Sequence, residues 1–103
     1  IYLYMVKKKF KIKNKVWIWP GETANWFFVC VDEPFVQDIR EWSKGKRGFG
    51  AVRVRAKIRK TEWESSMFWS KKDSCYMFPL KAQVRKEESI LDGDEVEIKF
   101  ELI

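Results

Sequence analysis

Basic side chains recur at every second position in one stretch of the chain, as Arg53, Arg55, Lys57 and Arg59. In an extended strand, alternate side chains lie on one face about 6.5 Å apart, because each residue rises about 3.3 Å. This spacing is close to the distance between successive phosphates of a nucleic acid, whose backbone dominates the affinity of its protein partners. The row therefore predicts a surface able to follow a nucleic-acid backbone.

A second group combines positive charge with aromatic rings. Between residues 11 and 19, one face of an alternating segment carries Lys11, Lys13, Lys15, Trp17 and Trp19. Charge beside stacking surfaces is the arrangement that single-strand binders use. An interface with another subunit would explain the two tryptophans equally well, because exposed apolar patches mark interaction sites.

A structural interpretation competes with nucleic-acid binding. Acidic residues occupy the outward positions of two other expected strands, at Glu62, Glu64, Glu95, Glu97 and Glu101. If these strands lie beside the basic ones, the charges form cross-strand pairs of modest energy in water. Alternating charge of this kind is usual on the outward face of an antiparallel sheet, so this alternative is favoured.

Catalytic and metal chemistry find little support in the residue types. The chain has no histidine, which removes the usual general base and the commonest transition-metal ligand. Its two cysteines, Cys30 and Cys75, stand apart, and we interpret them as buried free thiols, with one long-range disulfide as the alternative. We therefore expect no metal, no cofactor and no catalytic residue. Tyr76 or Lys81 would act as a base only with a lowered pKa.

Size and composition indicate one cytoplasmic domain spanning residues 1–103. Lys and Arg number 21 against 15 Asp and Glu, a net charge of +6 that favours anionic partners. Abundant Lys, Arg and Glu also fit a thermophilic source. The longest apolar run, Trp26 to Val31, is too short to span a membrane. Ile1 to Val6 are apolar but precede lysines, which is the wrong order for a secretory signal.

The elements that would position these side chains are mostly strands. Alternation and turn residues predict six strands, at Phe10–Trp19, Trp26–Val31, Ala51–Lys60, Glu62–Phe68, Tyr76–Leu80 and Glu95–Ile103. Helical spacing predicts two short helices, at Glu33 to about Ser43 and Lys81 to about Glu88. No repeating strand–helix–strand unit is visible, so the fold class is an all-β barrel.

Details of this scheme can be tested one by one. Asp32 is expected to cap the first helix, which Gly45 stops after it crosses one barrel opening. Trp26 to Val31 is apolar on both faces and is expected to be a central strand covered on both sides. Trp26, Trp42 and Trp63 are expected in the core.

Several short motifs, taken in order and spacing, resemble the prokaryotic family called domain of unknown function 1905. The similarity runs from about Phe10 to Ile103, so residues 1–9 form an extension outside it. The motifs that carry it are Trp26-Phe27-Phe28-Val29, Gly48-Phe49-Gly50, Trp63 with Ser65-Ser66, Tyr76, Pro79-Leu80-Lys81-Ala82, Val84-Arg85-Lys86 and Gly93-Asp94-Glu95-Val96.

This resemblance implies a fold but no activity. The implied fold is a six-stranded barrel of the double-split type, shared with swapped-hairpin transcription factors. Some members are linked to bacteriocin-protection proteins of the YdeI type. The chain departs from the family pattern at Phe78, where Leu is common, at Trp69, where Pro is common, and at Lys60-Thr61, where glycine is usual.

The polar members of the family motifs suggest an anion site. They are Arg53, Ser66, Tyr76, Lys81 and Arg85, whose cations and hydroxyls would hold a phosphate or a carboxylate if the barrel brings them together. In the alternative, Lys81 and Arg85 pair with Glu87, Glu88 or Asp94. The sequence thus predicts a non-enzymatic binding module, with nucleic acid first to test. A small-ligand domain or accessory enzyme using Lys81 and Arg85, and a structural or self-assembly role, are the alternatives.

Overall fold

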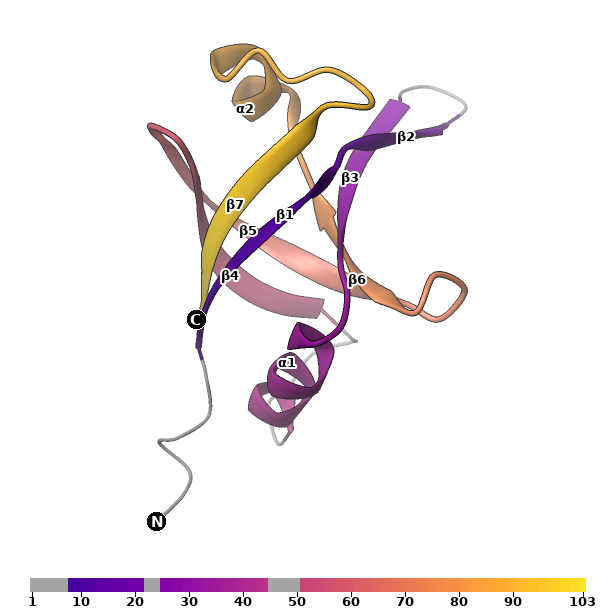
Figure 1. Cartoon of the computed structure of the whole chain (residues 1–103), viewed down its shortest axis with the longest axis vertical. Coiled ribbons are helices and arrows are strands. Elements are labelled where there is room, and N and C mark those ends of the chain that lie inside the picture. The colour runs from indigo at the N-terminus through magenta and orange to yellow at the C-terminus, as the bar shows by residue number, and fades with distance from the viewer. Residues whose placement is uncertain (1–7, 22–24, 45–50) are drawn as a thin grey trace.

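The structure is a computed structural model that describes residues 8–21, 25–44 and 51–103. It is an all-β protein with two short helices, as expected (Figure 1). In chain order the elements are β1 (Lys9–Lys15), β2 (Trp17–Pro20), β3 (Asn25–Val31), α1 (Phe35–Ser43), β4 (Ala51–Ile58), β5 (Thr61–Ser70), β6 (Cys75–Pro79), α2 (Ala82–Glu87) and β7 (Glu95–Leu102).

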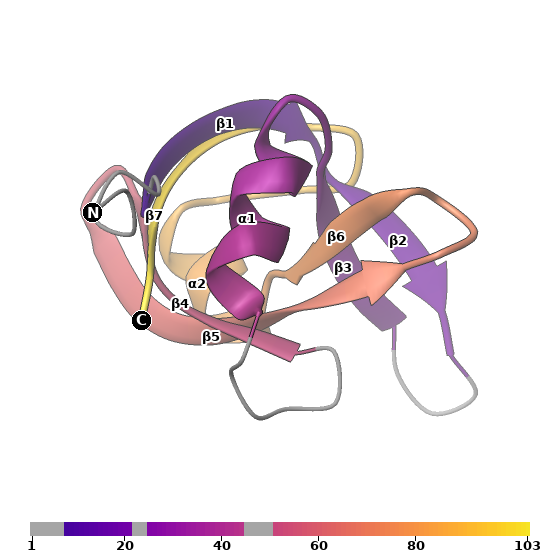
Figure 2. The ribbon, with the colours of Figure 1, turned by 90° about the horizontal axis from the view of Figure 1, so that it is seen from below.

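The strands form one antiparallel sheet in the order β1-β7-β4-β5-β6-β3-β2. Its two edge strands, β1 and β2, follow each other in the chain and are separated only by Val16. The sheet is therefore curled, so that its first and last strands are consecutive parts of one continuous segment of the chain (Figures 1 and 2). At the junction, the Val16 amide donates to the Asp94 carbonyl and the Gly93 amide donates to the Val16 carbonyl, both at 2.8 Å.

The expected number of strands needs a correction. The structure has seven strands where the sequence predicted six, because the segment Phe10–Trp19 is divided at Val16. Its first part pairs with β7 and its second part with β3. One straight strand cannot follow two neighbours that diverge in a curled sheet, so the ladder breaks where the partner changes.

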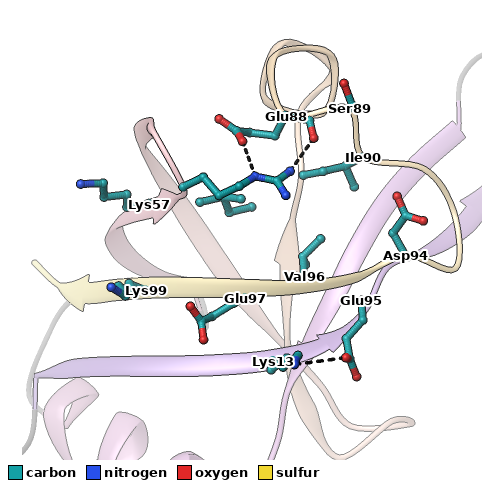
Figure 3. Close-up of a pocket in the computed structure, with 12 residues that line it drawn as sticks. Lys13, Lys57, Glu88, Ser89, Ile90, Asp94, Glu95, Val96, Glu97 and Lys99 are labelled. Carbon is teal, nitrogen blue, oxygen red and sulfur yellow. Dashed lines mark hydrogen bonds and ion pairs between the residues drawn. The ribbon is translucent and has the colours of Figure 1, made fainter.

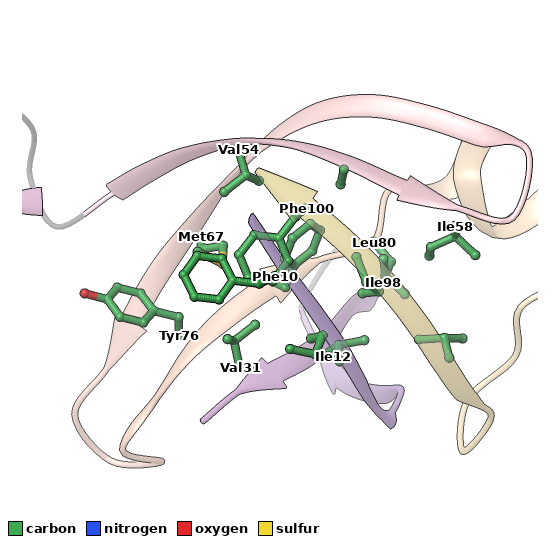
Figure 4. Close-up of a cluster of buried hydrophobic side chains, with 14 of the residues drawn as sticks. Phe10, Ile12, Val31, Val54, Ile58, Met67, Tyr76, Leu80, Ile98 and Phe100 are labelled. Atoms are coloured by element: carbon green, nitrogen blue, oxygen red, sulfur yellow. The ribbon is translucent and has the colours of Figure 1, made fainter. Parts of the chain in front are cut away.

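Inward side chains of the curled sheet form the core (Figure 4). The alternation in β4 and β7 is confirmed, since every second residue of each strand is buried. Phe100 stacks on Phe10 with 5.1 Å between ring centroids and lies 5.7 Å from Phe78, which meets Trp63 edge-on at 6.0 Å. Burying each of these side chains contributes about 1.5–3 kcal/mol of transfer free energy.

The two helices lie at opposite ends of the curled sheet (Figure 1). Helix α1 crosses one opening, as predicted, and buries Val36 and Ile39 there (Figure 2). The predicted cap was wrong. The helix begins at Phe35 without a side-chain cap, and Asp32 contributes its backbone carbonyl, which accepts from the Phe35 amide at 3.1 Å. Gly45 and the Gly48-Phe49-Gly50 motif lie outside the described residues.

Strand β3 is less covered than its composition suggested. Val29 and Val31 are fully buried, but Trp26 is 59% exposed, so the prediction that Trp26 belongs to the core was wrong. Pairing with β6 begins only at Phe28, and Trp26 therefore lies beyond the end of that neighbour. The other two expectations hold, because Trp63 is buried and Trp42 packs against the core.

Cys30 and Cys75 are joined in a disulfide, which corrects their interpretation as free thiols. The bond links β3 to β6, and the two Cα atoms lie 5.7 Å apart across 45 positions of sequence. Cys75 is almost fully buried. Neither helix in the described part of the chain has the length and apolar character needed to cross a membrane.

Candidate functional site

The arginines of β4 lie on the outer face of the sheet and contact carboxylates of neighbouring elements. Arg53 pairs with Glu64 at 3.2 Å, and Arg55 lies 3.7 Å from Glu64 and 3.9 Å from Glu101. Arg59, in the turn after β4, pairs with Glu88 at 2.6 Å. The cross-strand alternative that the sequence favoured therefore describes Arg53 and Arg55, whereas the partner of Arg59 lies at the end of α2.

The lysines of β1 follow the same pattern at similar distances. Lys11 lies 3.9 Å from Glu97, and Lys13 lies 3.5 Å from Glu95. Lys57 of β4 differs, since no carboxylate of the described residues lies within 4.0 Å of its amino group. Most of the positive charge proposed to meet a nucleic acid is thus already matched within the fold.

Trp17 and Trp19 are separated from these lysines by the change of partner at Val16. They lie opposite Phe28 and Trp26 of β3, while the lysines lie opposite β7. The Trp17 ring is 6.1 Å from that of Trp19 and 5.5 Å from that of Phe28. The lysines and the aromatic rings therefore lie beside different strands, β7 and β3.

The five anion candidates fall into three places. Arg53 donates to the Ser66 hydroxyl at 3.1 Å while also binding Glu64. Tyr76 is buried against α1 and Trp69, whose ring is 5.2 Å away. Burial raises the pKa of the Tyr76 hydroxyl, against the opposing effect of Arg40, which also hydrogen-bonds it. Tyr76 thus fastens α1 to the sheet.

Lys81 and Arg85 lie together at a different cavity of about 240 Å³. It opens between β3, the middle of β5 and the start of α2, and its lining includes Trp26, Phe27, Trp63 and Ser65. We call it the α2 pocket. The two basic residues are one helical turn apart, and the Arg85 amide donates to the Lys81 carbonyl at 3.1 Å.

Arg85 is held in one orientation by two contacts. Its Nε donates to the Leu80 carbonyl at 3.0 Å, and its guanidinium carbon lies 3.7 Å from the centroid of the Phe27 ring. Such stacking over an aromatic face stabilises a guanidinium and limits its rotation. The end of the side chain is therefore positioned by the protein before any ligand arrives.

The two cations of the α2 pocket form no ion pair within the described residues, and Glu64, which also lines the pocket, pairs with Arg53 and Arg55. No carboxylate of the described residues lies within 4.0 Å of Lys81 or Arg85, so the expected pairing with Glu87, Glu88 or Asp94 is not formed. Glu88 binds Arg59 and Thr61, Glu87 accepts from Gln83 and Thr61, and Asp94 accepts from the Leu91 amide.

Trp63 adds a feature that the sequence did not reveal. It lines the α2 pocket, and its buried indole N–H has no hydrogen-bond partner among the described residues. A buried unpaired donor is uncommon in folded proteins. Alternation assigned Trp63 to the core correctly, but nothing in the sequence indicated that its polar edge would remain unpaired.

A larger groove of about 700 Å³ lies between β4, β7 and the end of α2 (Figure 3). Positive and negative side chains mix along it, and Lys13–Glu95 and Arg59–Glu88 form ion pairs there. Lys57 and Lys99 extend from neighbouring strands without a carboxylate within 4.0 Å among the described residues. Sequence reasoning missed Lys99, because it sits in an otherwise acidic row of β7.

The described residues contain no cluster of three potential metal ligands of the His, Cys, Asp or Glu type. A comparison with curated proteins finds no match. A comparison with family models matches residues 13–100 to a domain of unknown function, DUF1905. This agrees with the resemblance drawn from the motifs, and the chain belongs to the DUF1905 family.

Proposed function

We propose that the protein is a non-enzymatic binding module that holds a small organic anion in the α2 pocket. The observation that carries this proposal is the placement of Lys81 and Arg85 at one aromatic-lined cavity. Glu64 also lines this cavity, but no carboxylate of the described residues lies within 4.0 Å of either cation. Positive charge beside an apolar protein surface attracts anions more strongly than the same charge in open water.

Arg85 supplies the geometry of recognition. Because Leu80 and Phe27 fix one side of its guanidinium group, the remaining N–H donors face a ligand with little loss of side-chain entropy. A carboxylate accepts two parallel hydrogen bonds from such a group. Lys81 is exposed and adds a flexible second charge.

The aromatic lining favours an anion that also has a flat apolar part. Trp26 and Phe27 present ring surface at the cavity, and Trp26 is exposed enough to contact a ligand directly. Planar groups stack on such rings. An aromatic carboxylate therefore suits the cavity better than a bare inorganic ion.

Nucleic acid is the second candidate and has less support. The arginines that would contact phosphates already bind Glu64, Glu101 and Glu88, so a polyanion would have to displace these carboxylates. Breaking each arginine–glutamate pair costs part of the attraction that the new arginine–phosphate contact would provide.

Calorimetric titration with benzoate tests the first candidate. We expect binding to wild-type protein, a loss of at least tenfold in Arg85→Ala, a smaller loss in Lys81→Ala, and no change in Lys86→Ala. Lys86 is the matched control because it is an exposed cation on the same helix. Absence of benzoate binding, or equal losses in all three variants, would contradict the proposal.

A parallel titration with single-stranded DNA tests the second candidate. If DNA binds through the arginine row, affinity falls steeply with salt and is lost in Arg55→Glu, while Arg85→Ala retains it. Benzoate binding in Arg55→Glu should equal that of wild type. No DNA binding at low salt would eliminate nucleic acid as the partner.

A further inference from the structure

The outer face of the sheet carries rows of side chains that run across neighbouring strands. One row reads Lys9, Glu101, Arg55 and Glu64 across β1, β7, β4 and β5, because each residue lies directly opposite the next. Charges alternate perfectly along this row. Opposite charges at facing positions stabilise a sheet.

The adjacent row breaks this alternation. Lys11 lies directly opposite Lys99, and Lys99 lies directly opposite Lys57, so three lysines occupy three neighbouring strands. We call them the lysine row. Neighbouring strands are about 4.8 Å apart, and like charges at facing positions are destabilising. The fold therefore keeps a repulsive arrangement beside one that is matched.

Little within the protein neutralises the lysine row. Lys11 comes within 3.9 Å of Glu97, while Lys57 and Lys99 have no carboxylate within 4.0 Å among the described residues. All three line a groove of about 490 Å³ on the outer face. Figure 3 shows Lys57 and Lys99 extending from neighbouring strands, with no dashed line to another of the residues drawn.

We propose that the lysine row is a second anion site, separate from the α2 pocket, and that it takes a compact oligophosphate. Repulsion among the ammonium groups is relieved when a multiply charged anion lies between them. Lysine ammonium groups bind phosphate as point charges and need no fixed geometry.

Surrounding carboxylates set the size of the ligand. Glu62 lies opposite Lys57 and ends the row on β5, while Glu97 and Glu101 flank Lys99 on β7. A long polyanion would meet these carboxylates on leaving the row. The three ammonium groups span about two strand spacings, roughly 10 Å. A short chain of phosphates fits within this boundary.

The site has a signature that an ordinary surface lysine would not show. Lys99 takes part in both repulsive pairs, so Lys99→Gln should raise the melting temperature at low ionic strength and at the same time weaken binding. This gain in melting temperature should shrink as added salt screens the charges. A purely structural role for Lys99 predicts a fall in melting temperature and no effect on binding.

The probe is inorganic tripolyphosphate, titrated by calorimetry at constant ionic strength. We expect binding to wild type, at least tenfold weaker binding in Lys99→Gln and Lys57→Gln, and unchanged binding in Lys86→Gln. Arg85→Ala should bind tripolyphosphate as wild type does while losing benzoate, which separates this proposal from the α2 pocket. Absence of tripolyphosphate binding, or an equal loss in Lys86→Gln, would overturn the proposal. So would a single-stranded DNA that binds the row more tightly than tripolyphosphate.

Discussion

Arg59 holds Glu88 by two hydrogen bonds of 2.6 Å, one from Nε to the carboxylate and one from Nη2 to the backbone carbonyl. The two residues are 29 positions apart and connect the β4–β5 turn to the end of α2. Arg59 has a φ of +50°, a backbone conformation that residues other than glycine rarely adopt. The contact thus helps to keep this turn in an unfavourable backbone conformation.

Two substitutions of Arg59 separate its contact from its backbone strain. Arg59→Ala loses the contact and keeps the strain, whereas Arg59→Gly loses the contact and relieves the strain. We expect both variants to be less stable than wild type, and the alanine variant to be less stable than the glycine variant by about 1 kcal/mol. Urea denaturation of the three proteins measures this order. An alanine variant as stable as the glycine variant would show that the turn is unstrained.

Glu88 predicts a dependence of stability on pH. Hydrogen bonds from Thr61, then from Arg59, lower the pKa of Glu88 below the ordinary value of 4.5, against a smaller effect of desolvation. Glu88 therefore binds its proton less tightly in the folded state than in the unfolded state. The contribution of ionised Glu88 to the free energy of unfolding is complete above pH 4.5. It is lost as the pH falls through the lowered pKa.

Substitution of Glu88 removes this part of the acid response. In Glu88→Gln the free energy of unfolding should be lower than wild type near neutral pH, and the difference should narrow as the pH falls below 4.5. Urea midpoints measured from pH 7 to pH 3 test this. The exposed Glu33→Gln is the control, and a constant gap between Glu88→Gln and wild type would contradict the assignment.

The disulfide between Cys30 and Cys75 closes a long loop. Reduction should lower the free energy of unfolding by about 3–4 kcal/mol, because an open chain gains entropy when it unfolds. Denaturation with and without a reducing agent measures the loss. The double variant Cys30→Ala/Cys75→Ala should be insensitive to the reducing agent, and equal stability of reduced and oxidised wild type would contradict this prediction.

Phe78 occupies a position where, by the resemblance, Leu is the common residue of the family. Its fully buried ring contacts Trp63 and Phe100, so Phe78→Leu should lose about 1–2 kcal/mol from two aromatic pairs. Thermal denaturation checks this against Phe68→Leu, whose ring is 49% exposed and whose replacement should change stability little. An unchanged midpoint in Phe78→Leu would mean that the core repacks around leucine.

The sequence predicted the strands best where one face alone is buried. In β4 and β7 the alternation identifies each inward residue, because these strands lie inside the sheet with a matched neighbour on each side. Trp26 could not be placed this way. Its segment is apolar on both faces, and its exposure depends on β6 beginning to pair only at Phe28.

The candidate sites show the same limit. Lys81 and Arg85 are one helical turn apart, so a local pattern was enough to group them. Tyr76, Arg53 and Lys99 required the strand order, which no spacing along the chain contains. The lysine row likewise exists only because β7 lies between β1 and β4.

The meeting of both sheet edges at Val16 has a consequence for biosynthesis. Strand β1 is made before the other described strands, but its partner β7 is made after them. Until residue 102 leaves the ribosome, the nascent chain must carry an unmatched strand, and closure is then a single late event between distant segments. Translation therefore sets the earliest moment at which the curled sheet can form in full.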